Sequence, residues 1–284
     1  MKEPIADLLD HLLLERLEEN LFRGDSRSIG YRSVFGGQVL GQALTAAART
    51  VEGRLAHSFH AYFLLPGDTQ APIIYDVERI RDGRSFTTRR VVAIQHGRAI
   101  FNMAASFQIR DEGIEHQAEM PRVPEPEELR SKAELNQRAA QNAPEKVRSF
   151  LLRQLPIEFR PVRPTDPLHP QPQPPQQQMW LRAVGPLPDD PQIHQAILAY
   201  ASDFPLLGTA LLPHGLSFLQ KGARAASLDH AMWFHRDFRV DEWLLYAMES
   251  PSASNARGLS WGRFFTRDGE LVASTAQEGM IRRP

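Results

Sequence analysis

Apolar residues recur at helical spacing in three parts of the chain. The first stripe, within residues 5–21 and before Gly24, consists of Ile5, Leu8, Leu9, Leu12 and Leu13. Residues 35–48 are small and apolar on nearly every side, as in a helix enclosed by a sheet. A third stripe consists of Ile193, Ala196, Ile197 and Tyr200. The pattern predicts an amphipathic docking helix, a buried central helix at 35–48, and a third helix in the second half.

Short runs of β-branched and aromatic residues follow the second and third of these helices. Between residues 57 and 110 the runs are separated by Pro66-Gly67, Asp82-Gly83 and His96-Gly97. Near the end of the chain they are separated by Arg257-Gly258 and Asp268-Gly269. Tight turns between short strands are typical of antiparallel sheets. Each half is therefore predicted to consist of a helix followed by a sheet.

The second half repeats the order and spacing of the first. Residues 59–63 align with 229–233, residues 73–75 with 244–246, Glu78 with Glu249, and Gly97 with Gly269, at offsets of 170 to 172. We expect two similar domains, 1–118 and 192–284. The segment 119–191 contains Glu-rich and Gln-rich helical stretches, followed by 11 of the 22 prolines between Pro156 and Pro191, so it is predicted to be a linker with helical segments.

Composition narrows the function classes. The chain has 284 residues, 33 basic and 34 acidic, with no long run of either sign, which disfavours nucleic acid as a partner. It has no cysteine, so disulfides, thiolate metal sites and a cysteine nucleophile are excluded. We expect a soluble, cytoplasmic protein with no membrane insertion, because neither a signal-peptide pattern nor 18 consecutive apolar residues occurs.

Five sequence strings resemble the type II acyl-CoA thioesterases. They are residues 34–39 (VFGGQV), 57–60 (HSFH), 72–77 (PIIYDV), 228–235 (LDHAMWFH) and 272–279 (VASTAQEG). The resemblance covers nearly the whole chain and is weaker in the linker. It implies an α+β double hotdog fold, in which two tandem repeats each wrap a long helix in a curved antiparallel sheet. It also implies hydrolysis of acyl-CoA, with coenzyme A as part of the substrate and no cofactor.

The same resemblance implies three site residues, Asp203, Ser227 and Gln277. Together they would activate a water for attack on the thioester carbonyl, without a covalent protein nucleophile. Many relatives carry Thr at the position of Ser227, and Ser keeps the hydroxyl. The residue types suit this chemistry, since a carboxylate accepts a proton while a hydroxyl and an amide both donate and accept hydrogen bonds. Taken by its local sequence alone, Asp203 could equally be a helix-end residue bonded to backbone.

The first repeat lacks at least two of the three groups, because Gln277 aligns with Ala105 and Ser227 with His57. We expect that repeat to be structural or to shape the substrate site. A competing serine motif, Gly258-Leu259-Ser260-Trp261-Gly262, satisfies the pattern of a nucleophile elbow. That motif requires a strand, a sharp turn and a helix, whereas the residues after Ser260 are predicted to continue as a strand.

Other polar and aromatic residues have simpler explanations. Gly36, Gly37 and Gly41 do not match a P-loop or a dinucleotide motif, and they are expected to allow close helix packing; backbone N–H groups at that helix start could also bind an oxyanion. His57 and His60 fall on opposite faces of a strand and lack the carboxylate partner and spacing of a zinc site. His230 and His235 also fall on opposite faces, so they are expected to be core or interface histidines with hydrogen-bond partners rather than catalytic groups. Four aromatic residues are predicted to pack the sheet on the helix and in part to line an acyl tunnel: Trp233, Phe234, Phe238 and Trp243.

Two alternative functions remain open from the sequence. A hotdog hydratase or dehydratase would need an acid and a base in one site, and Asp229 with His230 is the only adjacent pair of that kind. Neighbouring strand residues point to opposite faces, which disfavours it. The other alternative is a non-catalytic acyl-CoA binding protein. The family resemblance further implies a homo-oligomer, a dimer or tetramer, while the coenzyme A contacts, for which Arg257 and Arg263 are two of many candidates, stay unassigned.

Overall fold

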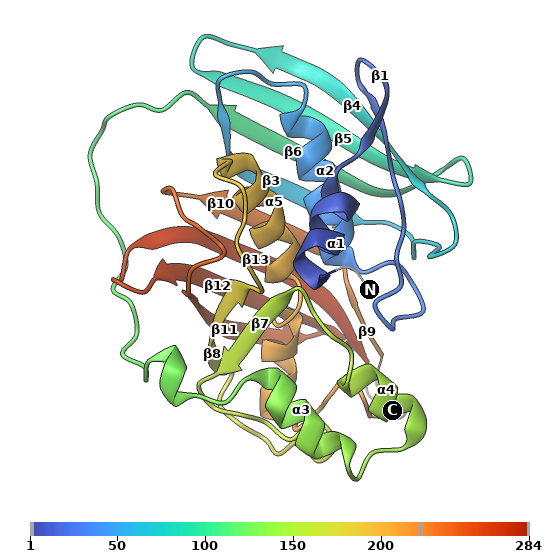
Figure 1. Ribbon diagram of the computed structural model, residues 1–284, viewed down its shortest axis with the longest axis vertical. Coiled ribbons are helices and arrows are strands. Elements are labelled where there is room, and N and C mark those ends of the chain that lie inside the picture. Colours follow the sequence, from blue (N-terminus) through green and yellow to red (C-terminus); the bar gives the residue numbers. More distant parts are fainter. Residues whose placement is uncertain (1–2, 221, 223, 283–284) are drawn as a thin grey trace.

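The computed structural model describes residues 3–220, 222 and 224–282, and Figure 1 shows one large antiparallel sheet curved around two central helices. Within these described residues the sheet has 13 strands. Its first half runs inward from the edge as β1 (Glu15–Glu18), β2 (Leu21–Gly24), β4 (Ile73–Asp82), β5 (Phe86–Gln95), β6 (Arg98–Gln108) and β3 (Leu55–Phe63). Its second half runs outward as β10 (Asp229–Phe234), β13 (Leu271–Arg282), β12 (Arg257–Thr266), β11 (Leu244–Ser254), β8 (Gln176–Ala183) and β7 (Ile157–Pro161). The short strand β9 (Arg224–Ser227) pairs with β13.

The two halves of the sheet meet at β3 and β10. These strands pair antiparallel, with His60 opposite Ala231. On either side of this junction the strands follow in the same chain order, so the sheet is close to symmetric about it. Alternate residues of β10 are buried, which places His230 on the inner side of the sheet and Asp229 on the outer side. The repeat seen in the sequence therefore corresponds to two matching half-sheets joined edge to edge.

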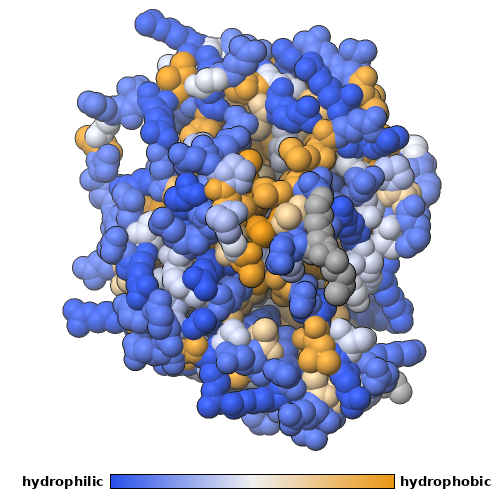
Figure 2. All heavy atoms as spheres, viewed as in Figure 1, coloured by the Kyte–Doolittle hydropathy of each residue, from blue (hydrophilic) through white to orange (hydrophobic). Residues whose placement is uncertain are grey.

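Helices α2 (Gly36–Ala48) and α5 (Pro191–Ser202) pack against each other on the inner side of the sheet. Gly37 explains how closely they approach, because a Cβ atom at this position would lie 2.3 Å from the backbone oxygen of Tyr200. The expected close helix packing at these glycines is confirmed. Both helices are buried almost all round, and their apolar surface joins the inner residues of the sheet in one large core. On the face shown in Figure 2, hydrophobic side chains gather in a band down the middle, between hydrophilic flanks.

The N-terminal docking helix is shorter than the sequence pattern predicted. Helix α1 (Pro4–Leu12) ends before Leu13, whose backbone is extended and whose side chain is 70% exposed. A longer helix would bring Glu15, Arg16 and Glu19 onto the face that α1 buries, which is unfavourable for charged side chains. The chain instead forms β1 and β2 at the edge of the sheet.

The segment 119–191 contains the expected helical pieces and also two strands that its proline content concealed. The helices are η1 (Pro126–Glu128), α3 (Lys132–Ala140) and α4 (Glu145–Leu151). Strand β8 pairs with β11, and β7 covers its outer edge. Trp180 in β8 is 1% exposed and donates its indole N–H to the oxygen of Pro124. These strands are the counterparts of β2 and β1, so part of the predicted linker belongs to the second half-sheet.

The chain continues from α5 into a second helical piece, η2 (Leu207–His214), after a short turn at residues 203–206. By length and composition the segment 191–214 could cross a membrane, but 72% of its window is buried inside the fold. This burial is what the core helix of a globular protein shows. The helix packs on the sheet at two glycines, since added Cβ atoms at Gly258 and Gly279 would meet Ala210 and Leu207 at 2.6 and 2.5 Å.

Candidate active site

Asp203 lies at the end of α5, beneath the inner side of the sheet. Residues 196–201 of the helix are apolar or aromatic, and the helix stops after Ser202 because Pro205 follows and cannot continue it. Asp203 is the C-cap residue and keeps a helical backbone. Its side chain is only 5% exposed. A carboxylate is thus held in a mostly apolar place, where its interactions with a few neighbours matter most.

The structure brings the three residues implied by the resemblance into contact. Nε2 of Gln277, on β13, donates to Oδ1 of Asp203 at 2.6 Å and to Oγ of Ser227 at 2.9 Å. Ser227 ends β9, pairs with Gly279 on β13, and donates to the same Oδ1 at 3.4 Å. Residues separated by up to 74 positions along the chain therefore form one hydrogen-bonded group.

Burial raises the pKa of Asp203 above its usual value. Hydrogen bonds from Gln277, from the backbone N–H of Gly37 and from Ser227 act in the opposite direction, because they stabilise the carboxylate. Burial is the larger effect. The carboxylate can consequently accept a proton more readily than an exposed Asp would.

The first half of the chain contributes to this site through the start of α2. The N-cap residue Phe35 provides no side-chain cap to the helix, and the N–H of Gly37 bonds to Asp203 instead. A Cβ at Gly36 would lie 2.7 Å from Oδ2 of Asp203, so only glycine permits this approach. The N-terminal end of the helix dipole faces the carboxylate. The sequence expectation that N–H groups at this helix start could bind an oxyanion corresponds here to the hydrogen bond from the Gly37 N–H to Asp203.

A cavity of about 600 Å³ opens beside Asp203 and Ser227. Most of its wall comes from the first half of the chain, in residues 31–36, 39, 63–67 and 100–101. The rest comes from 203–204, 207, 218 and 224–228. Six aromatic side chains line it: Tyr31, Phe35, Phe63, Phe101, Phe204 and Phe218. The cavity offers apolar space next to the polar group, as a thioester with an acyl chain requires.

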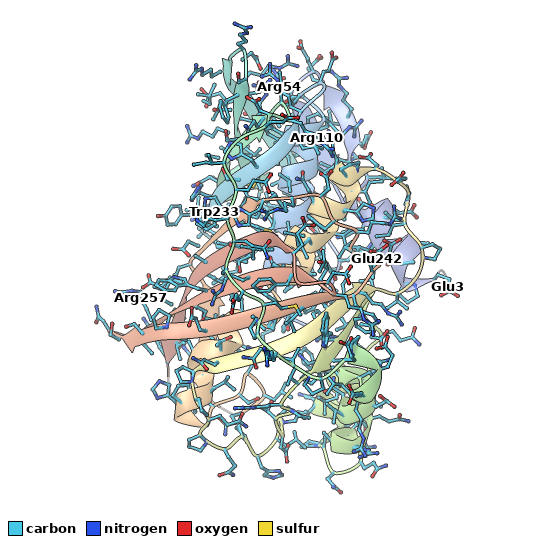
Figure 3. All side chains as sticks on the ribbon, turned by 90° about the vertical axis from the view of Figure 1, so that its left-hand side faces the viewer. Glu3, Arg54, Arg110, Trp233, Glu242 and Arg257 are labelled. Carbon is cyan, nitrogen blue, oxygen red and sulfur yellow. The ribbon has the colours of Figure 1, made fainter. Side chains whose placement is uncertain are left out.

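The prediction that part of the set Trp233, Phe234, Phe238 and Trp243 lines an acyl tunnel is wrong for this cavity, because none of them is in its wall. Phe234 and Phe238 stack in the core. Trp233 lies on the outer side of the sheet, as Figure 3 shows, with its ring against His60. Trp243 packs in a separate cluster with Trp180 and beneath Arg182. The sequence pattern correctly identified these residues as packing aromatics. It did not show where the cavity beside the start of α2 would lie.

Comparison with known proteins decides the family. The sequence matches the acyl-CoA thioesterase N-terminal domain over residues 22–108 and acyl-CoA thioesterase over 152–280. It is 45% identical over 283 residues to acyl-CoA thioesterase 2 of Haemophilus influenzae, covering 99% of both chains. The chain belongs to the acyl-CoA thioesterase family.

Solved structures agree with this thioesterase assignment. An acyl-CoA thioesterase II from Mycobacterium marinum superposes with a TM-score of 0.80 at 46% identity, covering 98% of each chain. A protein with a hotdog fold from Alicyclobacillus acidocaldarius gives a TM-score of 0.78 at 21% identity, again over 98% of each chain. The second likeness shows the fold alone. The expected α+β double hotdog is confirmed.

Ser260 of this thioesterase is not in a nucleophile elbow. It lies within β12, directly opposite Gln277 on β13, and the strand continues to Thr266. The elbow requires a turn into a helix at the serine, so the strand prediction made from the sequence is confirmed. Ser260 is fully buried, and among the described residues its Oγ has no hydrogen-bond partner. Oε1 of Gln277, on the paired strand, also has no hydrogen-bond partner among the described residues.

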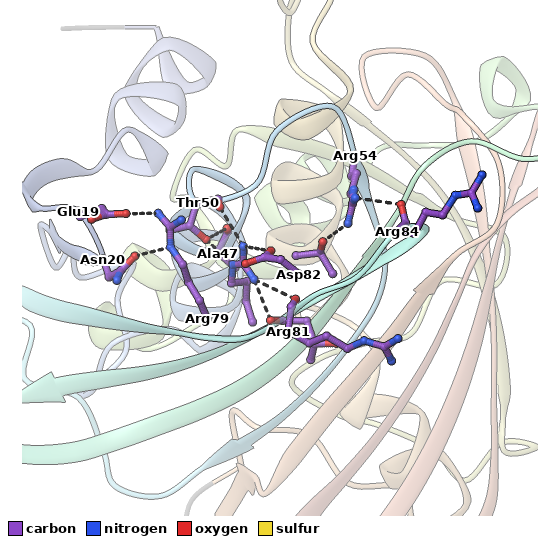
Figure 4. A network of polar contacts seen from close by, with 12 residues as sticks. Glu19, Asn20, Ala47, Thr50, Arg54, Arg79, Arg81, Asp82 and Arg84 are labelled. Atoms are coloured by element: carbon purple, nitrogen blue, oxygen red, sulfur yellow. Dashed lines mark hydrogen bonds and ion pairs between the residues drawn. The ribbon is translucent and has the colours of Figure 1, made fainter.

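The equivalent position in the first half is occupied by a buried arginine. Arg89 pairs with Ala105 in β5 and β6, as Ser260 pairs with Gln277 in β12 and β13. Its guanidinium bonds to Oγ1 and to the backbone oxygen of Thr50, just after α2, at 2.8 and 3.1 Å, and to Asp82 at 2.6 Å. Figure 4 shows this network. The first repeat therefore has a charged cluster that stabilises the end of α2, where the second has Asp203 and Gln277.

The remaining candidates have ordinary partners. His57 bonds to Ser106, and His235 to Ser274, each at 2.8 Å. Within the described ranges, no group of three or more His, Asp or Glu residues could hold a metal ion. Arg257 lies near the far tip of the second half-sheet in Figure 3 and pairs with Glu278 at 2.9 Å. These contacts do not identify a residue that binds the phosphates of coenzyme A.

Proposed function

We propose that the protein hydrolyses fatty acyl-CoA to a free fatty acid and coenzyme A. In this proposal Asp203, Ser227 and Gln277 orient and activate one water molecule, which attacks the thioester carbonyl directly. The observation that carries the proposal is the hydrogen-bonded contact of these three side chains at the wall of an apolar cavity. The family and the relatives named as acyl-CoA thioesterases support it.

The reaction divides the tasks among the groups as follows. Asp203 takes a proton from the water, whose oxygen then bonds to the carbonyl carbon. Both N–H groups of the Gln277 amide are occupied by Asp203 and Ser227, so the amide holds these two acceptors in place. The start of α2, where the Gly37 N–H bonds to Asp203, places a positive helix end near the charge that develops. The carbon–sulfur bond then breaks, and the proton passes from Asp203 to the leaving thiolate.

The hydratase alternative has little support from the geometry. Its acid and base would be Asp229 and His230, which lie on opposite sides of β10. The carboxylate of Asp229 accepts the backbone N–H of Glu278 at 2.7 Å, and Asp229 is not in the cavity wall. A non-catalytic acyl-CoA binding protein differs from a hydrolase only in releasing no thiol, and a thiol-release assay separates the two.

Mass spectrometry of the protein during turnover tests the direct attack of water. We expect the unmodified mass throughout, in the wild type and in Ser227→Ala. A mass increase equal to the acyl group, lost in Ser227→Ala or Ser260→Ala, would contradict the proposal and identify a nucleophile. A cytoplasmic location, a role in lipid metabolism, the absence of a cofactor and assembly into a dimer or tetramer stay predictions.

A further inference from the structure

His230 is buried beside the proposed base, on the central strand β10. Its side chain is fully buried, and its ring stacks on Phe59. Nε2 lies 3.0 Å from Oγ of Ser202, and Nδ1 lies 4.0 Å from Oδ1 of Asp203. Among the described residues Nδ1 has no hydrogen-bond partner. One ring nitrogen is thus anchored, and the other faces the carboxylate.

Counting protons assigns the tautomer of this ring. The hydroxyl of Ser202 has one proton, and Oγ lies 2.9 Å from the backbone oxygen of Ala199, which can only accept. Because Ser202 donates that proton to the oxygen of Ala199, Nε2 of His230 must be the donor in its contact with Oγ of Ser202. Nδ1 then carries a lone pair. A neutral imidazole with this tautomer satisfies both hydrogen bonds of Ser202.

The imidazole stays neutral because burial lowers the pKa of His230 to about 3. A lone pair on Nδ1, 4.0 Å from Oδ1 of Asp203, is unfavourable while the carboxylate is charged. It becomes an acceptor once the carboxyl carries a proton, since closing the gap by about 1 Å forms an ordinary hydrogen bond. His230 therefore favours the protonated form of Asp203.

Three neighbours of Asp203 act against this effect, and burial outweighs them. Asp203 receives hydrogen bonds from Gln277, Ser227 and Gly37, all of which favour its charged form. Tyr246 on β11 bonds to Thr275 and to the backbone oxygen of Ser202, and burial raises its pKa, so it is a neutral donor directed elsewhere. Among the described neighbours, the Nδ1 atom of His230 is placed to accept from Asp203.

We infer that His230 is a positioning residue that strengthens Asp203 as a base, by accepting a hydrogen bond from its carboxyl group after that group has taken the proton from water. The inference rests on the proposed function, in which Asp203 is the base. The proton moves from water to Asp203 and later to the thiolate of coenzyme A. His230 neither gains nor loses a proton in this sequence.

The test is the pH profile of kcat/KM for His230→Gln, measured by release of coenzyme A from an acyl-CoA ester. Glutamine can keep an N–H near the position of Nε2, but it has no acceptor at Nδ1. We expect the acid limb, which reports the base of the free enzyme, to move down by about one pH unit. The plateau should fall by about tenfold, because a weaker base transfers the proton less well.

His60→Gln is the matched control. It makes the same replacement on the neighbouring strand β3, opposite Ala231 and on the exposed outer side of the sheet. Its profile should be unchanged.

If His230→Gln does not fold, Ser202→Ala gives the same test. Without the Ser202 acceptor the imidazole can move its proton to Nδ1 and stabilise the charged carboxylate, which again moves the acid limb down.

Two results separate the inference from the proposed function. A folded His230→Gln variant with an unmoved acid limb, alongside an inactive Asp203→Asn variant, would overturn the inference and leave the proposed function standing. An active Asp203→Asn variant would overturn the proposed function itself. A downward shift in His230→Gln or Ser202→Ala, with the His60→Gln profile unchanged, supports the inference.

Discussion

Gln277 donates a 2.6 Å hydrogen bond from Nε2 to Oδ1 of Asp203. The bond joins the sheet to the end of the helix on which the proposed base lies, and it uses one of the two protons of the amide. The second proton goes to Ser227. The orientation of the amide is therefore determined by two acceptors, and exchanging its NH₂ group for an oxygen should disrupt both contacts.

Gln277→Glu tests this relationship with nearly the same side-chain shape. The substitution places two carboxyl groups in contact, which raises the pKa of the pair and leaves a shared proton where the water should be activated. We expect kcat/KM at neutral pH to fall by about 10²-fold or more. The rate of thiol release measures it, and circular dichroism checks folding. Activity near that of the wild type would show that the amide does not orient the site.

Asp203→Asn should stabilise the protein at neutral pH while it removes activity. The folded-state pKa of Asp203 is raised, so the folded protein binds this proton more tightly than the unfolded chain. The stability that this group contributes is present below its ordinary pKa of 3.8 and is lost as pH rises through the raised value. The variant has no carboxylate to ionise. The melting temperature of the variant should match that of the wild type in acid and exceed it at neutral pH. A melting-temperature difference from the wild type that falls between acid and neutral pH would contradict this.

Ser260→Ala should leave catalysis intact. The serine lies within a strand, and its buried hydroxyl has no partner among the described residues. Removing an unpaired buried hydroxyl should leave the free energy of unfolding unchanged or raise it by about 1 kcal/mol. We expect kcat/KM to stay within about threefold, or about 0.7 kcal/mol. Complete loss of thiol release in a folded variant would instead identify Ser260 as a catalytic group.

Arg89→Met should weaken folding without changing the chemistry. Arg89 is 1% exposed and bonds to the backbone oxygens of Thr50, Arg81 and Thr88. Leaving buried carbonyl groups unpaired should lower the free energy of unfolding by about 2–4 kcal/mol. Urea unfolding measures this, with exposed Arg90→Met as the matched control. Turnover per folded molecule should be unchanged; a strong loss of kcat would assign the first repeat a catalytic role.

The sequence predicted the two central helices and the two repeated half-sheets well, for a physical reason. The small apolar residues of 35–48 can be accommodated only inside the fold, and the 170-residue offset required two matching half-sheets. Strand β1 was not found because it is a charged edge strand whose residues are all exposed. Strand β7 was not found because its alternation, with Ile157 and Phe159 buried, covers only five residues within a proline-rich segment. Their place is determined by pairing with distant strands, which a local pattern does not contain.

The site was predicted less completely. Asp203, Ser227 and Gln277 came from the family resemblance, and the structure brings them together. His230 was interpreted as a core histidine, which is correct for its burial but omits its neighbour. Strand alternation shows that His230 points inward, yet only the packing of α5 beneath β10 places Asp203 next to it. The signal available in the sequence was a histidine within segment 229–233, which aligns with residues 59–63 of the first repeat.

The most direct test follows the release of coenzyme A thiol from acyl-CoA esters of short to long chain, for the wild type and Asp203→Asn at matched folding. The protein has no cysteine, so it adds no thiol signal of its own. We predict release by the wild type and a loss of at least about 10³-fold in the variant, within the range for removal of a general base. Equal rates in the two proteins, or no release by the wild type from any ester, would contradict the proposal that Asp203 activates the hydrolytic water.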